Sequence, residues 1–146
     1  DNTANNFYIT GIQLEIGDLE TATDFEHRSF GDELARCQRY FQRYMDTDNY
    51  EPSGFTGIAT SSTRAYFSGR FTVPMRSTPS MTHADLRIDK FSTGFNYNGT
   101  ANLDGATTEK AALFLVDTAS GLVTGDPYHL IASTSDPQHL SFDAEL

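Results

Sequence analysis

Two short stretches of the chain place aromatic rings beside side chains that can hydrogen-bond sugar hydroxyls. A glycan site needs an exposed ring to stack on the apolar face of a sugar, together with Asn, Asp or Gln for its hydroxyls. The candidate contacts are Phe95, Asn96, Tyr97 and Asn98 in the first stretch and Asp126, Tyr128 and His129 in the second. Ordinary strand and turn residues with half-buried rings have the same composition. A glycan site and a purely structural role therefore both stay open.

The sequence predicts no catalytic residue. A nucleophile elbow of the form G-x-S-x-G is absent, and the four histidines have no Ser or Cys partner at a recognisable spacing. They are His27, His83, His129 and His139. Hydrolysis of a glycan by two carboxylates remains an alternative, because the twenty Asp and Glu residues give many pairs whose separation only the fold decides. We expect a binding protein rather than an enzyme.

Residues 45–51 begin like a calcium-binding loop. Asp46 and Asp48 stand at alternate positions, as calcium ligands do, but Tyr50 stands at the next ligand position. We interpret this segment as a solvated acidic turn. Histidines four residues apart, which would suggest a zinc site on a helix, are also absent. The sequence thus predicts no metal and no cofactor.

One short helix is indicated in the first third of the chain. Ser29 is a candidate N-cap, and Asp32 and Glu33 follow in the first turn, where negative charge favours the helix dipole. Residues 38–44 then alternate like a strand. We expect a helix of about two to three turns that runs into a strand.

The single cysteine lies in this helix. Cys37 shares a helix face with Leu34, and we expect that face to be buried and Cys37 to be a small core side chain rather than a catalytic thiol. One cysteine excludes an intrachain disulfide. Stability must therefore come from packing or from assembly.

The rest of the chain predicts an all-β fold. Apolar residues alternate through residues 7–16 with an offset at Thr10-Gly11, which suggests a strand with a glycine bulge. After residue 46 helical periodicity is absent, and Asn98-Gly99 predicts a hairpin turn. About eight short strands fit a jelly-roll-like β-sandwich. The expected strands are 55–60, 64–74, 80–89, 93–97, 111–117, 121–124, 128–133 and 139–145.

Residues 111–116, AALFLV, form the one nearly continuous apolar run in the second half of the chain. Such a run predicts a central strand that is buried on both faces. A strand of a small sandwich normally has one face exposed to solvent, so burial of both faces suggests contact with another subunit. We expect Leu113, Phe114 and Leu115 to lie at that interface.

Charge and length exclude several classes of partner. The chain has 146 residues, a formal net charge of −10 and a pI near 4.6, which suits one acidic domain, or one domain and the end of another. Nucleic-acid binding draws on clustered Lys and Arg, of which there are only ten in total. No apolar run is long enough to cross a bilayer. We expect neither nucleic-acid binding nor membrane insertion.

Several ordered blocks of the sequence together form a recognisable pattern. They are Phe7, residues 10–17 (TGIQLEIG), 22–28 (ATDFEHR) and 33–40 (ELARCQRY), with weaker matches at 71–79 (FTVPMRSTP) and 143–146 (DAEL). This pattern resembles a segment near the C-terminus of tail fibre and related virion proteins of tailed bacteriophages. The resemblance implies a homotrimer in a virion fibre or spike that recognises a receptor on the host surface. The expected receptor is a glycan.

The resemblance also implies an order of parts. Residues 1–28 would be a strand and connector that close an upstream fibre domain, residues 29–45 a helix that runs into a strand, and residues 46–146 the C-terminal sandwich. We assign Glu26, Arg28 and Arg36 a structural role, because Glu and Arg beside a helix start tie a connector down through ion pairs. Across a symmetric trimer they would also fix its register.

Two other functions remain open. One is an architectural trimerisation or capsid-decoration module without a ligand. The other is a polysaccharide depolymerase, although such phage enzymes usually carry the active site on a long β-helix, whose repeats this chain lacks. The acidic charge favours a neutral sugar, or a charged one bridged by cations, over a phosphate-rich surface.

Overall fold

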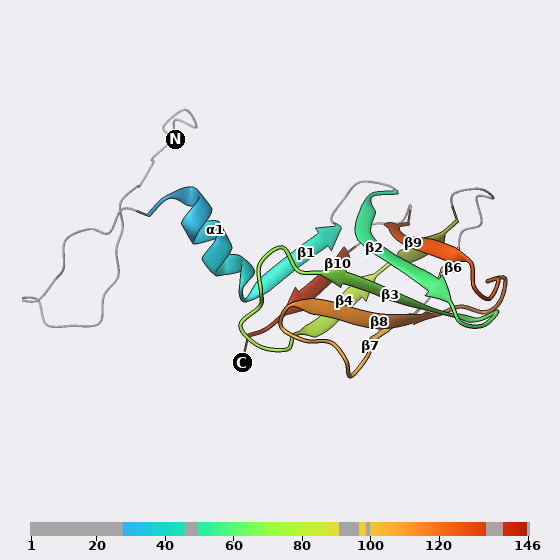
Figure 1. Cartoon of the computed structure of the whole chain (residues 1–146). Coiled ribbons are helices and arrows are strands. Elements are labelled where there is room, and N and C mark those ends of the chain that lie inside the picture. Colours follow the sequence, from blue (N-terminus) through green and yellow to red (C-terminus); the bar gives the residue numbers. More distant parts are fainter. Residues whose placement is uncertain (1–27, 46–49, 91–96, 99, 134–138, 146) are drawn as a thin grey trace, which may run out of the picture.

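The computed structural model describes residues 28–45, 50–90, 97–98, 100–133 and 139–145 (Figure 1). Within these ranges there are one short helix and ten strands, which form two curled antiparallel sheets and confirm the predicted all-β class. The elements are α1 (Phe30–Gln38), β1 (Phe41–Met45), β2 (Pro52–Ala59), β3 (Arg64–Arg70), β4 (Ser80–Ala84), β5 (Leu86–Asp89), β6 (Tyr97–Asn98), β7 (Thr100–Leu103), β8 (Ala111–Asp117), β9 (Pro127–Ala132) and β10 (His139–Asp143).

Some expectations fall outside the described residues. These are the strand at residues 7–16, the ion-pairing residue Glu26, the Asp46 and Asp48 positions of the acidic turn, and the candidate contacts Phe95 and Asn96.

Helix α1 begins and ends where the sequence predicts. The Oγ of Ser29 accepts a hydrogen bond from the backbone N of Asp32 at 3.2 Å, so Ser29 is the N-cap. The helix ends at Gln38 and β1 begins at Phe41, which confirms a helix that runs into a strand. No helix in the described ranges is long and apolar enough to cross a membrane.

The expectation that Leu34 and Cys37 are buried is wrong. Both are exposed, and no residue of α1 is buried. In Figure 1 the helix projects from one end of the sheets, so the described strands do not cover its apolar side. Helical spacing correctly placed the two residues on one face but gave no information on what covers that face.

The chain passes from one sheet to the other at Asp85. The three-stranded sheet has the order β1-β10-β4, and the seven-stranded sheet has the order β6-β5-β9-β2-β3-β8-β7. Strand β4 belongs to the first sheet and β5 to the second, so the single strand expected at 80–89 is divided. Asp85 between them has φ +48°, a left-handed conformation that Asp tolerates better than most residues.

The seven-stranded sheet curls strongly. Its edge strands β6 and β7 are separated by a single residue in sequence, and consecutive Cα atoms are about 3.8 Å apart, so the two edges must lie close together. The expected hairpin turn at Asn98-Gly99 is wrong, because β6 pairs with β5 and β7 pairs with β8.

Aromatic rings from both sheets form the centre of the core. Phe142 of β10 lies against Phe55 of β2 and against Phe71, with ring centroids 5.7 and 5.0 Å apart. Phe114 of β8 stacks on Phe67 of β3 at 5.8 Å. All five rings are buried, and they join the two sheets into one core.

Strand β8 lies between β3 and the edge strand β7, so it is not the central strand that the sequence predicts, and in the single chain only one of its faces is buried. Ala112, Phe114 and Val116 lie in the core, whereas Leu113 and Leu115 are partly exposed on the outer face. The expectation of burial on both faces is therefore wrong for the single chain. Phe114 cannot lie at a subunit interface, because its side chain is enclosed in the core.

Two further strand expectations differ from the structure. Residues 121–124 form no strand, since Gly121 and Gly125 adopt left-handed φ values of +103° and +87° that end an extended run. Residues 100–103 form β7, which the sequence did not predict. This short edge strand depends on its pairing with β8.

Candidate functional site

An open groove of about 670 Å³ lies on the outer face of the seven-stranded sheet, over β5, β9 and β2. Strand alternation explains which side chains line it. On β5, Leu86 and Ile88 are buried in the core, so Arg87 and Asp89 point to the outer face. His129 of β9 pairs with Asp89 across the ladder and also lines the groove.

Strand β2 bulges beside the groove. Its register against β9 shifts between Pro52 and Thr56, two residues that line the groove. Gly54 lies within this shift and has φ +79°, which glycine adopts without a steric penalty. The Oγ of Ser53 donates a hydrogen bond to the backbone O of Leu130 at 2.8 Å and holds the bulge against β9. The bulge therefore fixes the shape of one side of the groove.

Tyr50 supplies the exposed aromatic surface of the groove. The residue is 53% exposed, and its φ of +61° is a left-handed conformation that a bulky residue rarely adopts. The guanidinium carbon of Arg87 lies 4.9 Å from the centroid of its ring, within cation–π range. The two side chains thus lie against each other at the groove.

The polar groups of the groove are incompletely paired. The Nε2 of His129 lies 3.5 Å from the Oδ2 of Asp89. The Nε of Arg87 and the Oδ1 of Asp89 are buried, yet neither has a hydrogen-bond partner among the described residues. A buried polar atom without a partner costs about 1–3 kcal/mol, and folded proteins contain few of them. This concentration marks the groove as the strongest candidate site.

The second predicted stretch lies only partly in the groove. His129 lines it, but the ring of Tyr128 is 3% exposed, and its hydroxyl accepts a hydrogen bond from the backbone N of Val123 at 3.0 Å. A stacking role for Tyr128 is wrong, because it alternates with His129 along β9 and points into the core. Asp126 lies in the turn before β9, where the Nζ of Lys90 engages its carboxylate.

The described part of the first predicted stretch lies beside the groove. Tyr97 and Asn98 form β6, where Asn98 is opposite Arg87 and Tyr97 is opposite Ile88. The backbone of this stretch therefore runs along the strand that carries Arg87 and Asp89.

The residues assigned a structural role lie on or before α1. The Nη1 of Arg28 is 3.2 Å from the Oε2 of Glu33, so this part of the connector is tied to the first turn of the helix. Arg36 is exposed in the last turn, where a positive charge favours the helix dipole.

Sequence reasoning missed Tyr50, Arg87 and Asp89 as site residues. A signal was present for the last two, because the alternation of residues 86–89 (LRID) places two charged side chains opposite two apolar ones. No local signal identified Tyr50. Its position depends on long-range pairing of β2, β9 and β5, whose residues are far apart in sequence.

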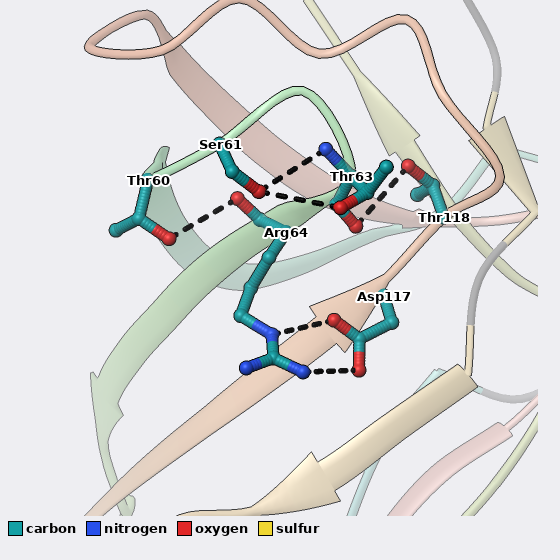
Figure 2. Close-up of polar contacts among 6 residues, drawn as sticks. All are labelled: Thr60, Ser61, Thr63, Arg64, Asp117 and Thr118. Atoms are coloured by element: carbon teal, nitrogen blue, oxygen red, sulfur yellow. Dashed lines mark hydrogen bonds and ion pairs between the residues drawn. The ribbon is translucent and has the colours of Figure 1, made fainter.

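A second polar cluster surrounds the β2–β3 hairpin (Figure 2). The Nε and Nη2 of Arg64 lie 2.6 and 2.9 Å from the Oδ1 and Oδ2 of Asp117. The hydrogen bonds from Arg64 lower the pKa of Asp117, and the same bonds raise the pKa of Arg64. Nearby hydroxyls bond within the same turns, namely those of Thr60, Ser61, Thr63 and Thr118. We assign this cluster a structural role, since its groups engage one another.

Potential metal ligands are scattered. The Nε2 of His83 lies 3.0 Å from the backbone O of Ala101, and Cys37 is exposed on α1. Within the ranges that the structure describes, no group of three or more His, Cys, Asp or Glu side chains is placed to hold a metal ion.

Comparison with known proteins provides no relative. No protein-family model, curated protein or solved structure matches the chain. The case for a function rests on the groove and on the sequence pattern.

Proposed function

We propose that this chain is the tip domain of a tail fibre or spike of a tailed phage, and that it binds a glycan on the host surface as a homotrimer. The observation that carries the proposal is the groove, where the exposed ring of Tyr50 lies beside Arg87, Asp89 and His129. The ring offers apolar surface to a sugar, and the polar side chains beside it suit sugar hydroxyls. The virion setting rests on the sequence resemblance.

The fold is compatible with this role. Two antiparallel sheets around an aromatic core suit a jelly-roll-like sandwich, which is the finer fold class that we propose. Such folds commonly serve as lectin domains and capsid domains.

We propose that subunits meet through the outer face of β2, β3 and β8. Ile58, Tyr66 and Leu115 lie in one row, because Ile58 pairs with Tyr66 and Tyr66 pairs with Leu115. Ile58 is 56% exposed, and Leu113 is partly exposed two residues from Leu115. Contiguous exposed apolar surface often marks a protein contact. This strip retains Leu113 and Leu115 at the proposed interface.

The helix would connect the tip to the rest of the fibre. Phe30 and Leu34 are exposed on α1, and we propose that an upstream fibre domain or a neighbouring subunit covers them. Arg28, held by Glu33, and Arg36 would fix the connector at this junction.

Three grooves on one trimer would make attachment durable. A single shallow sugar site binds modestly, but linked sites raise the overall affinity by about a hundredfold or more when they engage one surface together. Repetitive bacterial polysaccharides meet that geometric condition.

The proposal is tested by Tyr50→Ala, with Tyr40→Ala as the matched control. Tyr40 is also an exposed ring with an arginine over it, since the Cζ of Arg76 lies 5.4 Å from its centroid, but it does not line the groove. We expect Tyr50→Ala to weaken binding to host polysaccharide by about 1–3 kcal/mol per site. Tyr40→Ala should bind like the wild type. Equal binding by all three proteins contradicts the proposal.

Size-exclusion chromatography with light scattering separates the alternative functions. A trimer that co-elutes with intact polysaccharide supports receptor binding. A trimer that ignores every glycan supports the architectural module, and shortened polysaccharide supports a depolymerase.

A further inference from the structure

We infer that the sugar bound in this groove carries a carboxylate, and that the guanidinium of Arg87 binds it. The inference rests on the proposed function and specifies its ligand class, an acidic sugar such as a uronate. The supporting observation is that Asp89 faces His129, whereas the side chain of Arg87 has no anionic partner among the described residues.

Arg87 has no anionic partner in the described part of the chain. Asp89 lies two residues away on the same face, but its Oδ2 faces the Nε2 of His129 at 3.5 Å. No described residue forms a hydrogen bond or an ion pair with the side chain of Arg87, whose observed contact is the ring of Tyr50. A partly buried guanidinium without an anion is incompletely stabilised, and a ligand anion would complete its surroundings.

Other arginines of the chain differ from Arg87. Arg64 is paired with Asp117, and Arg28 is paired with Glu33. Arg76 lies over the ring of Tyr40 as Arg87 lies over Tyr50, but Arg76 is exposed to water, whereas Arg87 is partly buried. Arg87 combines a stacked guanidinium, a buried Nε and a position in a groove.

The planar fork of a guanidinium matches a carboxylate. This chain contains an example in the Arg64–Asp117 pair, where two nitrogens meet two oxygens at 2.6 and 2.9 Å (Figure 2). Because the Nε of Arg87 is buried, its terminal nitrogens Nη1 and Nη2 are the pair for a ligand. Stacking on Tyr50 restrains the plane of the fork, so less conformational entropy is lost on binding.

Charge favours a carboxylate over the other sugar substituents. A phosphate would bring up to two negative charges close to Asp89 in a chain whose net charge is −10. A neutral sugar would leave the guanidinium without a counter-charge. A single carboxylate pairs with Arg87, and the carboxylate of Asp89 can accept hydrogen bonds from hydroxyls of the same sugar.

The test uses oligosaccharides of glucuronate, galacturonate and sialate, each beside its carboxyl-reduced form, which has the same linkages without the charge. Binding of the purified full chain is measured by biolayer interferometry on surfaces that carry each sugar. We expect at least one acidic sugar to bind at least about tenfold more tightly than its reduced form. Arg87→Gln should abolish this preference, and Arg87→Lys should weaken it because the fork is lost. Arg76→Gln, the same change at a stacked arginine outside the groove, should retain it.

The outcomes separate this inference from the proposed function. Equal binding of acidic and reduced forms, or a preference that persists in Arg87→Gln, overturns the acidic ligand while glycan recognition stands. A tighter complex with a phosphorylated sugar likewise overturns it. If neither the acidic nor the reduced sugars bind, both proposals fall. Thermal melting of each variant shows that lost binding does not come from unfolding.

Discussion

Tyr50 combines two properties that folding alone does not favour. Its ring is largely exposed, and its backbone adopts a left-handed φ of +61°. Sparsely populated backbone conformations cost about 1–3 kcal/mol each and cluster at functional sites. In this chain the conformation holds the ring where Arg87 packs against it. The proposed binding role would explain why a tyrosine occupies a position that suits glycine or asparagine.

Replacing Tyr50 by Asn should separate stability from binding. Asn tolerates the left-handed region, so we expect the free energy of unfolding of Tyr50→Asn to stay the same or to rise by about 1 kcal/mol. Glycan binding should fall because the stacking surface is lost. Urea unfolding measures the first effect, and interferometry measures the second. A marked loss of stability with unchanged binding would show that the ring serves packing.

The Arg64–Asp117 pair should make a small part of the stability depend on pH. Its hydrogen bonds lower the pKa of Asp117 below the ordinary value of 3.8, so the pair stabilises the folded state above that value. The contribution is lost as the pH falls through the lowered pKa. We expect Asp117→Asn to melt below the wild type at about pH 7, and the difference in melting temperature to shrink as the pH falls below the ordinary pKa of 3.8. A difference in melting temperature that stays constant with pH would show that the Arg64–Asp117 pair does not cause it.

At the scale of elements, close contact between β2 and β3 depends on Gly57. A Cβ at this position would lie 2.2 Å from the backbone O of Tyr66 and 2.9 Å from ring atoms of Phe67. The oxygen belongs to the backbone of the paired strand and cannot rotate away as a side chain can. Any larger residue must therefore push the two central strands apart.

Gly57→Ala should accordingly be among the most destabilising single changes in the sheet. We expect a loss of roughly 3 kcal/mol, or about 6–12 °C in melting temperature, since an overpacked core must move backbone. Gly105→Ala is the matched control, because a Cβ there meets nothing within 4 Å. Differential scanning calorimetry of both variants gives the comparison. Equal melting temperatures for Gly57→Ala and Gly105→Ala would mean that β2 and β3 accommodate the added methyl group without strain.

The elements that the sequence predicted correctly are those with local signals. The N-cap at Ser29 and the apolar run of β8 were found in this way. The turn at Asn98-Gly99 was misread because strand pairing, which a dipeptide does not encode, places β6 and β7 at opposite edges of the sheet. The break between β4 and β5 at Asp85 was missed because an aspartate within an alternating sequence does not by itself predict a left-handed backbone conformation.

At the scale of the whole molecule, the site arises from pairing between distant strands. His129 was predicted because an aromatic and an acidic residue lie next to it in sequence. Tyr50 and Arg87 are 37 positions apart and meet only because β2 and β5 both pair with β9. No spacing rule captures such a contact. That the groove, with its exposed ring and polar neighbours, binds a glycan remains a prediction.

Assembly of the whole molecule should depend on the outer strip of Ile58, Tyr66 and Leu115. We expect Leu115→Glu to convert the proposed trimer into folded monomers, because the side chain points away from the core and a buried unpaired carboxylate is costly at an interface. Val123→Glu is the control, since Val123 is an exposed apolar residue outside the strip. Light scattering measures the mass, and far-UV circular dichroism checks the fold.

The same pair of variants links assembly to attachment. Monomers of Leu115→Glu should keep the single-site affinity for a soluble oligosaccharide, because the strip is not part of the groove, but should lose about a hundredfold in avidity for a polysaccharide surface. Val123→Glu should keep both. A Leu115→Glu protein that remains trimeric would place the interface elsewhere, and α1 with Phe30 and Leu34 would then be the next surface to test. A wild-type chain that is monomeric would remove multivalency from the mechanism and leave each groove to bind alone.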